Sequence, residues 1–185
     1  MNGFINGAIF LVAGALAGLA SAVATIELYS ATPVEPASPW QSWDVSPGSK
    51  IRPYALDHYL MAGRFPPAAG QMREFAAQKA NDGGGLNGAC NYVLVANAAP
   101  PLWWTLAAFS SGSSSAVPNT VITADTAVIE NDGSIRLAVS RSPVSGNWIK
   151  PPSSGGFTLL YTIAEPSSSL SREPLPIFAI ERSGC

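Results

Sequence analysis

Charged side chains are scarce in this 185-residue chain, at 12% against a usual share of about 25% in soluble domains. Hydrophobic residues reach 47%, and this composition argues against an intrinsically disordered protein. Ten Lys and Arg against twelve Asp and Glu leave a net charge of −2, with no block of like charge. The basic surface that a phosphate backbone requires is therefore missing, and we expect no nucleic-acid partner.

Histidine and cysteine are also rare, which limits the catalytic and metal sites that the chain can build. His58 is the single histidine, so a catalytic triad can be built only around it. Asp57 beside it would project elsewhere on a helix and is a poor partner to orient the ring. Cys90 and Cys185 form no CxxC pair and lack a partner at zinc spacing. We therefore predict no catalytic residue, no metal and no cofactor.

The two cysteines leave two alternatives open. Outside the cytoplasm, Cys90 and Cys185 can form a disulfide that closes a long loop and ties residue 185 to the domain. In the other alternative, Cys90 is a buried free thiol. The sequence cannot choose between them, because it does not show whether the two Cα atoms come within about 7 Å.

A long apolar run stands at the N-terminus, where residues 4–24 carry no charge. Its length of roughly 20 residues matches a helix that crosses a hydrocarbon core of about 30 Å. Ala20-Ser21-Ala22 resembles a signal-peptidase site, so a cleaved signal peptide is the competing interpretation. No basic residue precedes the run, and the run exceeds the usual apolar core of a signal peptide, so we expect residues 1–29 to stay as a transmembrane signal anchor.

One face of this expected helix is lined by small residues, because Gly14, Gly18 and Ala22 recur every four residues. Such a face lets another helix approach closely, and it predicts packing against other membrane protein subunits. The positive-inside rule gives no orientation, since the first basic residue is Lys50. A single N-terminal anchor most simply exports the residues C-terminal to it, so we expect a bacterial inner-membrane protein with its C-terminal domain in the periplasm.

Proline dominates the segment C-terminal to the helix. Residues 30–53 contain five prolines, each of which fixes φ and removes a hydrogen-bond donor, so we expect a linker or a wrapping segment there. Trp40 and Trp43 in this segment suit either the lipid headgroup zone or packing onto the domain. The remaining residues 54–185 are long enough for one extracytoplasmic domain with a single core.

Short apolar runs between turn residues predict that this domain is mainly β. Strands are expected at 92–96, 103–109, 157–163 and 175–181, a short helix at 57–63, and either helix or strand at 71–79 before a glycine-rich turn that suggests a hairpin. Asp132-Gly133 predicts a two-residue hairpin between 126–130 and 135–140, which assigns Asp132 to a turn rather than to an acid/base pair with Glu130. The pattern is typical of an antiparallel β-sandwich or a jelly-roll-like domain.

A series of short motifs gives the chain a family resemblance over roughly residues 50–165. The motifs, in order, are Arg52-Pro53-Tyr54-Ala55, Gly63-Arg64-Phe65-Pro66, Cys90-Asn91-Tyr92, Trp103-Trp104-Thr105, Asn131-Asp132-Gly133-Ser134 and Gly146-Asn147-Trp148-Ile149-Lys150-Pro151. Together they resemble the bacterial family called domain of unknown function 1214, although an arginine usual in that family is replaced in Leu159-Leu160-Tyr161. The resemblance implies an all-β, envelope-associated domain and supplies no reaction.

Aromatic and polar side chains within these motifs are the candidate binding residues. They are Tyr54, Arg64, Trp103, Trp104, Asn147 and Trp148. Aromatic planes with hydrogen-bonding groups suit a sugar or a protein partner, although core packing also explains the Trp-Trp pair. We expect Asn147-Trp148 to be the surface pair, because it lies in a loop region between prolines.

The combination predicts a non-enzymatic, single-pass membrane protein whose β domain acts as a structural or accessory subunit of a larger membrane complex. Low charge, a small-residue helix face and a proline-rich wrapping segment all fit association with a partner. The alternative is an extracytoplasmic enzyme or binding module for envelope carbohydrate or a small ligand. A concave cleft that gathers Arg64, an acid and tryptophans would favour that alternative.

Overall fold

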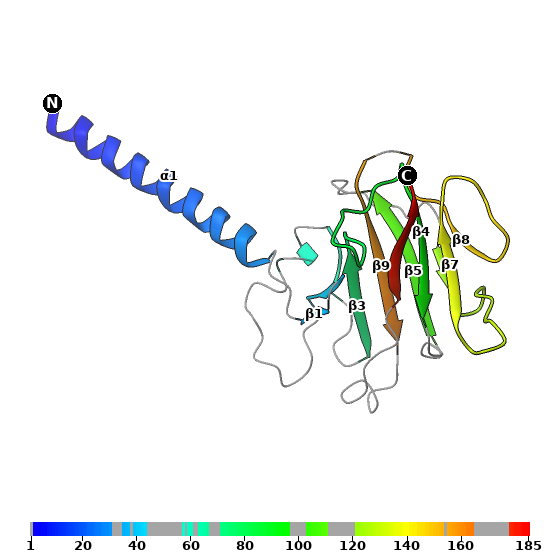
Figure 1. Cartoon of the computed structure of the whole chain (residues 1–185). Helices are drawn as coiled ribbons and strands as arrows, with labels where there is room; N and C mark the ends of the chain where they lie inside the picture. The colour runs from blue at the N-terminus through cyan, green and yellow to red at the C-terminus, as the bar shows by residue number, and fades with distance from the viewer. Residues whose placement is uncertain are drawn as a thin grey trace.

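Within the residues that it describes, the computed structural model contains one long helix and ten strands (Figure 1). It describes residues 2–30, 35–37, 39–43, 57, 59–60, 63–66, 71–96, 103–110, 121–153, 155–164 and 178–185. Tyr54 and His58 lie outside these described residues. The strands are β1 (Glu35–Ala37), β2 (Trp40–Ser42), β3 (Met72–Ala77), β4 (Asn91–Ala96), β5 (Trp103–Ser110), β6 (Val121–Thr123), β7 (Ile135–Val139), β8 (Asn147–Ile149), β9 (Phe157–Ala164) and β10 (Ala179–Gly184).

Helix α1 (Asn2–Ser30) contains the apolar run expected from the sequence. Its segment Ile5–Leu28 has 24 residues with a mean hydropathy of 2.2. At about 1.5 Å per residue this segment is roughly 36 Å long, enough to cross a bilayer. The hydroxyls of Ser21 and Thr25 donate to the carbonyls of Gly18 and Ser21, so both polar groups are satisfied within the helix. By length and composition, α1 fits a membrane anchor or a signal sequence.

The strands form two sheets that enclose a shared core, which confirms the mainly β, sandwich-like fold. One sheet has the order β1-β2-β3-β9-β5-β6 and the other β10-β4-β7-β8. Every pairing within them is antiparallel except that of β7 with β8, which is parallel. Alternate residues of β9, β4 and β7 are buried, as expected when each sheet turns one face to the core.

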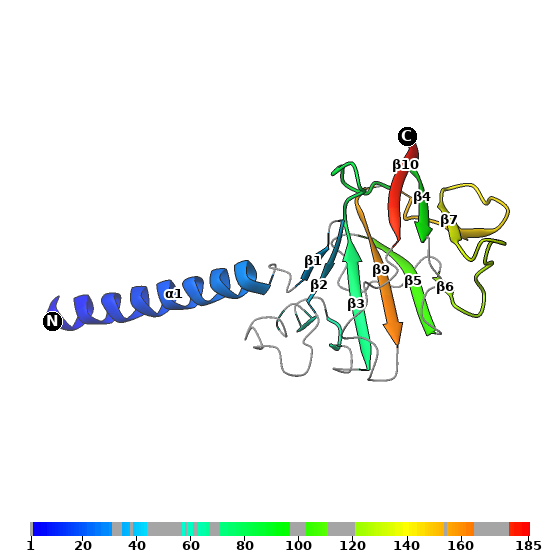
Figure 2. The same ribbon diagram turned by 60° about the horizontal axis from the view of Figure 1, so that its bottom comes forward.

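The proline-rich segment contributes to the sheet, which corrects the expectation that regular structure is disfavoured there. Strands β1 and β2 form a hairpin, and β2 pairs with β3 through Trp40 opposite Ala77. Trp40 is fully buried in the core, and its Nε1 donates to the carbonyl of Phe178 at 2.6 Å. This part of 30–53 is therefore built into the β domain, and the hairpin continues the six-stranded sheet toward α1 (Figure 2).

An aromatic cluster occupies the middle of the core. The ring centre of Tyr161 lies 5.3 Å from that of Phe178 and 6.0 Å from those of Trp40 and Trp104. Tilted or edge-on packing at such distances stabilises aromatic pairs beyond the burial of their area. The cluster joins β9, β5 and β2 of one sheet to the residue that precedes β10 of the other, so it ties the two layers together.

Several element predictions are confirmed and two are wrong. Strands β4, β5 and β9 match the expected runs, and 71–79 is resolved as strand β3. Gly133 has a φ of 82°, as its turn requires, but 126–130 is no strand; β7 instead pairs with β4 and β8. The glycine-rich turn after β3 does reverse the chain, with Lys79 bridged antiparallel to Gly85, but it does not pair β3 with the next strand, because β3 and β4 belong to different sheets.

Cys90 and Cys185 form a disulfide in the structure, so the first of the two alternatives for the cysteines is correct. Cys90 and Cys185, 95 residues apart, are bonded beside the paired residues Asn91 and Gly184. The bond therefore holds edge strand β10 against β4 at its end. Closing a loop of this length restricts the unfolded chain and is worth about 4–5 kcal/mol in a simple chain-entropy account.

We predict that Trp40→Ala lowers the free energy of unfolding by about 3–5 kcal/mol, because it removes a fully buried indole and orphans the Phe178 carbonyl. Chemical denaturation of the purified chain, followed by circular dichroism, measures the effect. Gln41→Ala is the matched control, since Gln41 is exposed on the same strand and should change stability by under about 0.5 kcal/mol. Equal stability of both variants would show that the hairpin is not part of the core.

Candidate functional site

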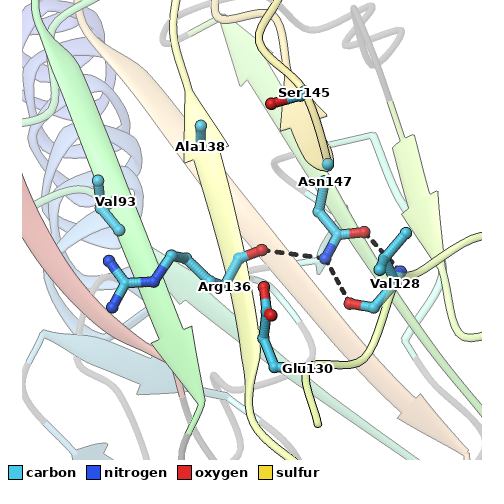
Figure 3. Close-up of a pocket in the computed structure, with 8 residues that line it drawn as sticks. Val93, Val128, Glu130, Arg136, Ala138, Ser145 and Asn147 are labelled. Carbon is cyan, nitrogen blue, oxygen red and sulfur yellow. Dashed lines mark hydrogen bonds between the residues drawn. The ribbon is translucent and has the colours of Figure 1, made fainter.

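The candidate site is a small pocket on the outer face of the four-stranded sheet (Figure 3). Its volume is about 140 Å³. Val93 on β4 and Ala138 on β7 are direct neighbours across the two strands and form an apolar floor. Their outward direction follows from strand alternation, because Leu94 and Leu137 beside them are fully buried. The other lining residues are Val128, Glu130, Arg136, Ser145, Gly146 and Asn147.

Asn147 forms one wall of the pocket and is fixed by three hydrogen bonds. Its Oδ1 accepts from the backbone N–H of Val128 at 2.7 Å, and its Nδ2 donates to the carbonyls of Val128 and Arg136 at 2.7 and 2.9 Å. These bonds attach the segment before the Gly133 turn to β7 and β8, as the dashed lines in Figure 3 show. Asn147 is therefore a buried positioning residue, which corrects the expectation that it is exposed on a loop.

Trp148 lies next to Asn147 on strand β8 and is partly buried. Its Nε1 donates to the backbone carbonyl of Ser140 at 2.9 Å and lies 3.1 Å from the Ser140 hydroxyl. The indole is thus held over the end of β7 and does not line the pocket. The Asn147-Trp148 motif accordingly shapes the region around the pocket, and its amide and indole N–H are used within the domain.

Groups of opposite charge lie at the rim of the pocket. Arg136 and Glu130 are both exposed, and in Figure 3 their side chains extend from the two sides of the lower part of the pocket. Asp132, two residues after Glu130, does not line the pocket; its carboxylate accepts hydrogen bonds from Ser134, which lower its pKa below the ordinary value. A cation, an anion and a hydroxyl above an apolar floor can bind a small polar molecule or a partner side chain.

The tryptophans at 103 and 104 point to opposite faces of β5 in the other sheet. Trp104 is buried in the aromatic cluster, whereas Trp103 is 44% exposed on the outer face of the six-stranded sheet. The expectation that the Trp-Trp strand turns one residue inward is confirmed. Trp103 lies on a different sheet from the pocket and does not line it.

Arg64 is fixed by a second set of contacts on the six-stranded sheet. Its Nη1 lies 2.8 Å from a carboxylate oxygen of Glu74 on β3, and its guanidinium lies 5.7 Å from the centre of the Tyr59 ring. Both partners are partly or fully buried. The structure therefore does not bring Arg64, Trp103 and Asn147 into one site, and Tyr54 lies outside the described residues.

The pocket residues Val93, Arg136, Ala138 and Ser145 were missed by reasoning from the sequence. The alternation of residues 135–140 does place Arg136 and Ala138 on the wet face of their strand. It does not reveal that β4 is the neighbouring strand, which brings Val93 beside Ala138. Among the residues that the structure describes, no group of three His, Cys, Asp or Glu is placed to hold a metal ion.

Residues 71–168 match a known protein family, described as a protein of unknown function and named DUF1214. The match covers more than half of the chain. The chain belongs to the DUF1214 family. The matched region includes the pocket residues and strands β3 to β9, so the candidate site lies within the DUF1214 domain itself. No protein of curated function matches the sequence.

Two solved structures are similar to this chain at low sequence identity. The VPA0106 protein from Vibrio parahaemolyticus is 16% identical, with a TM-score of 0.55 over 70% of this chain and 34% of its own length. An uncharacterized protein from Burkholderia cenocepacia is 18% identical, with a TM-score of 0.47 over 60% of this chain and 29% of its own. The chain thus corresponds to about a third of the length of each.

We predict that Asn147→Ala lowers the free energy of unfolding by about 1–3 kcal/mol, because it removes the buried amide that pairs three backbone groups of Val128 and Arg136. Urea denaturation measures the loss. Ser145→Ala is the control, since Ser145 lines the same pocket but is exposed. A loss no larger than that of the control would contradict the positioning role of Asn147.

Proposed function

We propose that this DUF1214 protein is a single-pass, membrane-anchored accessory subunit of a larger membrane complex. In this proposal α1 lies in the bacterial inner membrane and the β domain in the periplasm. One observation carries it: Ile5–Leu28 has a mean hydropathy of 2.2, and its residues 5–24 are all exposed in the structure. A helix with this much exposed apolar surface needs lipid or a partner helix around it.

The disulfide supports a location outside the cytoplasm. Cys90 and Cys185 both lie in the β domain, and bonds of this kind persist in oxidising compartments such as the bacterial periplasm. An N-terminal apolar helix followed by a disulfide-bonded domain fits export across the inner membrane. Helix and disulfide together therefore favour an envelope location for the domain.

One feature of α1 supports a partner. On α1, nothing lies within 4 Å of a Cβ built on Gly14 or Gly18, so this face with Ala22 leaves room for a second helix backbone.

We predict that the full-length chain is purified from native membranes in mild detergent together with stoichiometric companions, which intact-mass analysis identifies. Gly14→Ile combined with Gly18→Ile should release them, because the added side chains block close helix approach. Ala13→Ile with Ala20→Ile adds comparable bulk to the opposite face of α1 and should leave the complex intact. A chain that arrives alone, or shortened near Ala22, would contradict the proposal.

The pocket favours a second candidate function, a binding module for a small ligand. About 140 Å³ is smaller than the 300 Å³ or more of typical drug-sized sites, so it suits a small zwitterion better than an oligosaccharide. Its lining contains Arg136 and Glu130 for the two charges and no aromatic side chain on which a sugar ring could stack. The geometry therefore supports free amino acids over envelope carbohydrate for this candidate.

For this candidate function, we predict that a screen of free amino acids finds a ligand. Changes in the NMR chemical shifts of the β domain, measured on the full-length chain, should place that ligand at the pocket. Arg136→Ala and Glu130→Gln should each weaken its binding by about 10- to 100-fold, since each removes a charge-assisted hydrogen bond. Lys150→Ala is the control, because Lys150 is exposed and does not line the pocket. Binding that is insensitive to both pocket variants would refute the site.

A further inference from the structure

Two large apolar side chains of the β domain are exposed in one short segment. Phe65 is 93% exposed and Leu60 is 59% exposed, whereas Tyr59 beside them is 1% exposed. Among the large apolar side chains of the described residues, Phe65 has the largest exposed fraction. Packing within the domain does not account for the position of either side chain.

The segment is nevertheless held firmly on the β domain. The backbone N–H of Arg64 donates to the carbonyl of Tyr59 at 2.9 Å, and Gly63 supplies the positive φ of 64° that this reversal requires. The ion pair of Arg64 with Glu74 then fastens the segment to β3. Phe65 comes directly after this anchored residue, so its position on the domain surface is fixed by its neighbours.

The same side of the domain lies closest to the membrane helix. Only residues 31–34 separate Ser30 from Glu35, so the Cα atoms at the end of α1 and the start of β1 are at most roughly 18 Å apart. Strand β3 is two places from β1, or about 10 Å at the usual spacing. Both views place the cyan segment near residue 60 beside these strands, on the side of α1 (Figures 1 and 2).

We propose that Leu60 and Phe65 form a second membrane contact, inserting at the boundary between headgroups and acyl chains of the bilayer that holds α1. The short connection keeps the segment at high effective concentration near the lipid, so two apolar side chains suffice for a stable contact. It would hold the β domain against the membrane with a defined orientation. The inference rests on the proposed anchoring of α1.

The test uses the full-length chain, reconstituted in vesicles of phosphatidylethanolamine and phosphatidylglycerol. Phe65→Cys carries an environment-sensitive NBD label, and the Cys90–Cys185 disulfide keeps the native cysteines from reacting. Val144→Cys is the matched control, because Val144 is 48% exposed in the loop between β7 and β8, on the side away from α1 (Figure 1). Lipids with a nitroxide near the glycerol backbone quench labels at that depth, and vesicle flotation with carbonate extraction reports anchoring separately.

The proposal expects the label at residue 65 to emit at shorter wavelength than the label at 144 and to lose most of its fluorescence to the nitroxide lipid. Equal, weak quenching at both positions in carbonate-resistant protein would overturn the second contact and leave the anchor standing. The same result would arise if a protein partner, absent from the vesicles, covers this surface in place of lipid. Protein that carbonate extracts would instead overturn the anchoring itself.

Discussion

The burial of Trp40 is the constraint that joins the two parts of this protein. Its indole packs against Tyr161 and donates to the Phe178 carbonyl, yet it lies only ten residues after the last residue of α1. A domain that contains this residue in its core cannot be joined to α1 by a long connection. The hairpin of β1 and β2 therefore brings the edge of the six-stranded sheet close to α1 along the chain, with only residues 31–34 between them.

The strands could be predicted from the sequence where buried and exposed residues alternate regularly. Ile135, Leu137 and Val139 alternate cleanly and form β7, and the apolar runs of β4 and β9 are strands as expected. Where local signals compete, the prediction failed: prolines concealed β1 and β2, whose strand character depends on Trp40 reaching the distant Phe178. The segment 126–130 was wrongly expected to be a strand, because its place beside β7 is taken by β4 and β8.

The candidate site was harder to predict from the sequence, because it depends on contacts between residues that are distant in the chain. Asn147 was singled out from sequence, but its role arises from contacts with Val128 and Arg136, 19 and 11 residues away. The pocket floor depends on the register that sets Val93 opposite Ala138. Sequence alternation gives the direction of each side chain but not the neighbouring strand. Residues such as Arg64 and Trp103, grouped by their chemistry, consequently occupy a different sheet from the pocket.

The arrangement of the sheets separates three surfaces by their distance from α1. The small-residue face of α1 lies within the apolar span, and Phe65 follows Arg64, which is paired with Glu74 on β3, two strands from β1. Strand β7, which carries Arg136 of the pocket, lies on the far side of the domain from α1 in both views (Figures 1 and 2). A partner helix and a pocket ligand would therefore not compete for space. If α1 anchors the chain, the short connection to β1 keeps that side of the domain nearest the membrane, and the pocket on the opposite side faces the aqueous phase.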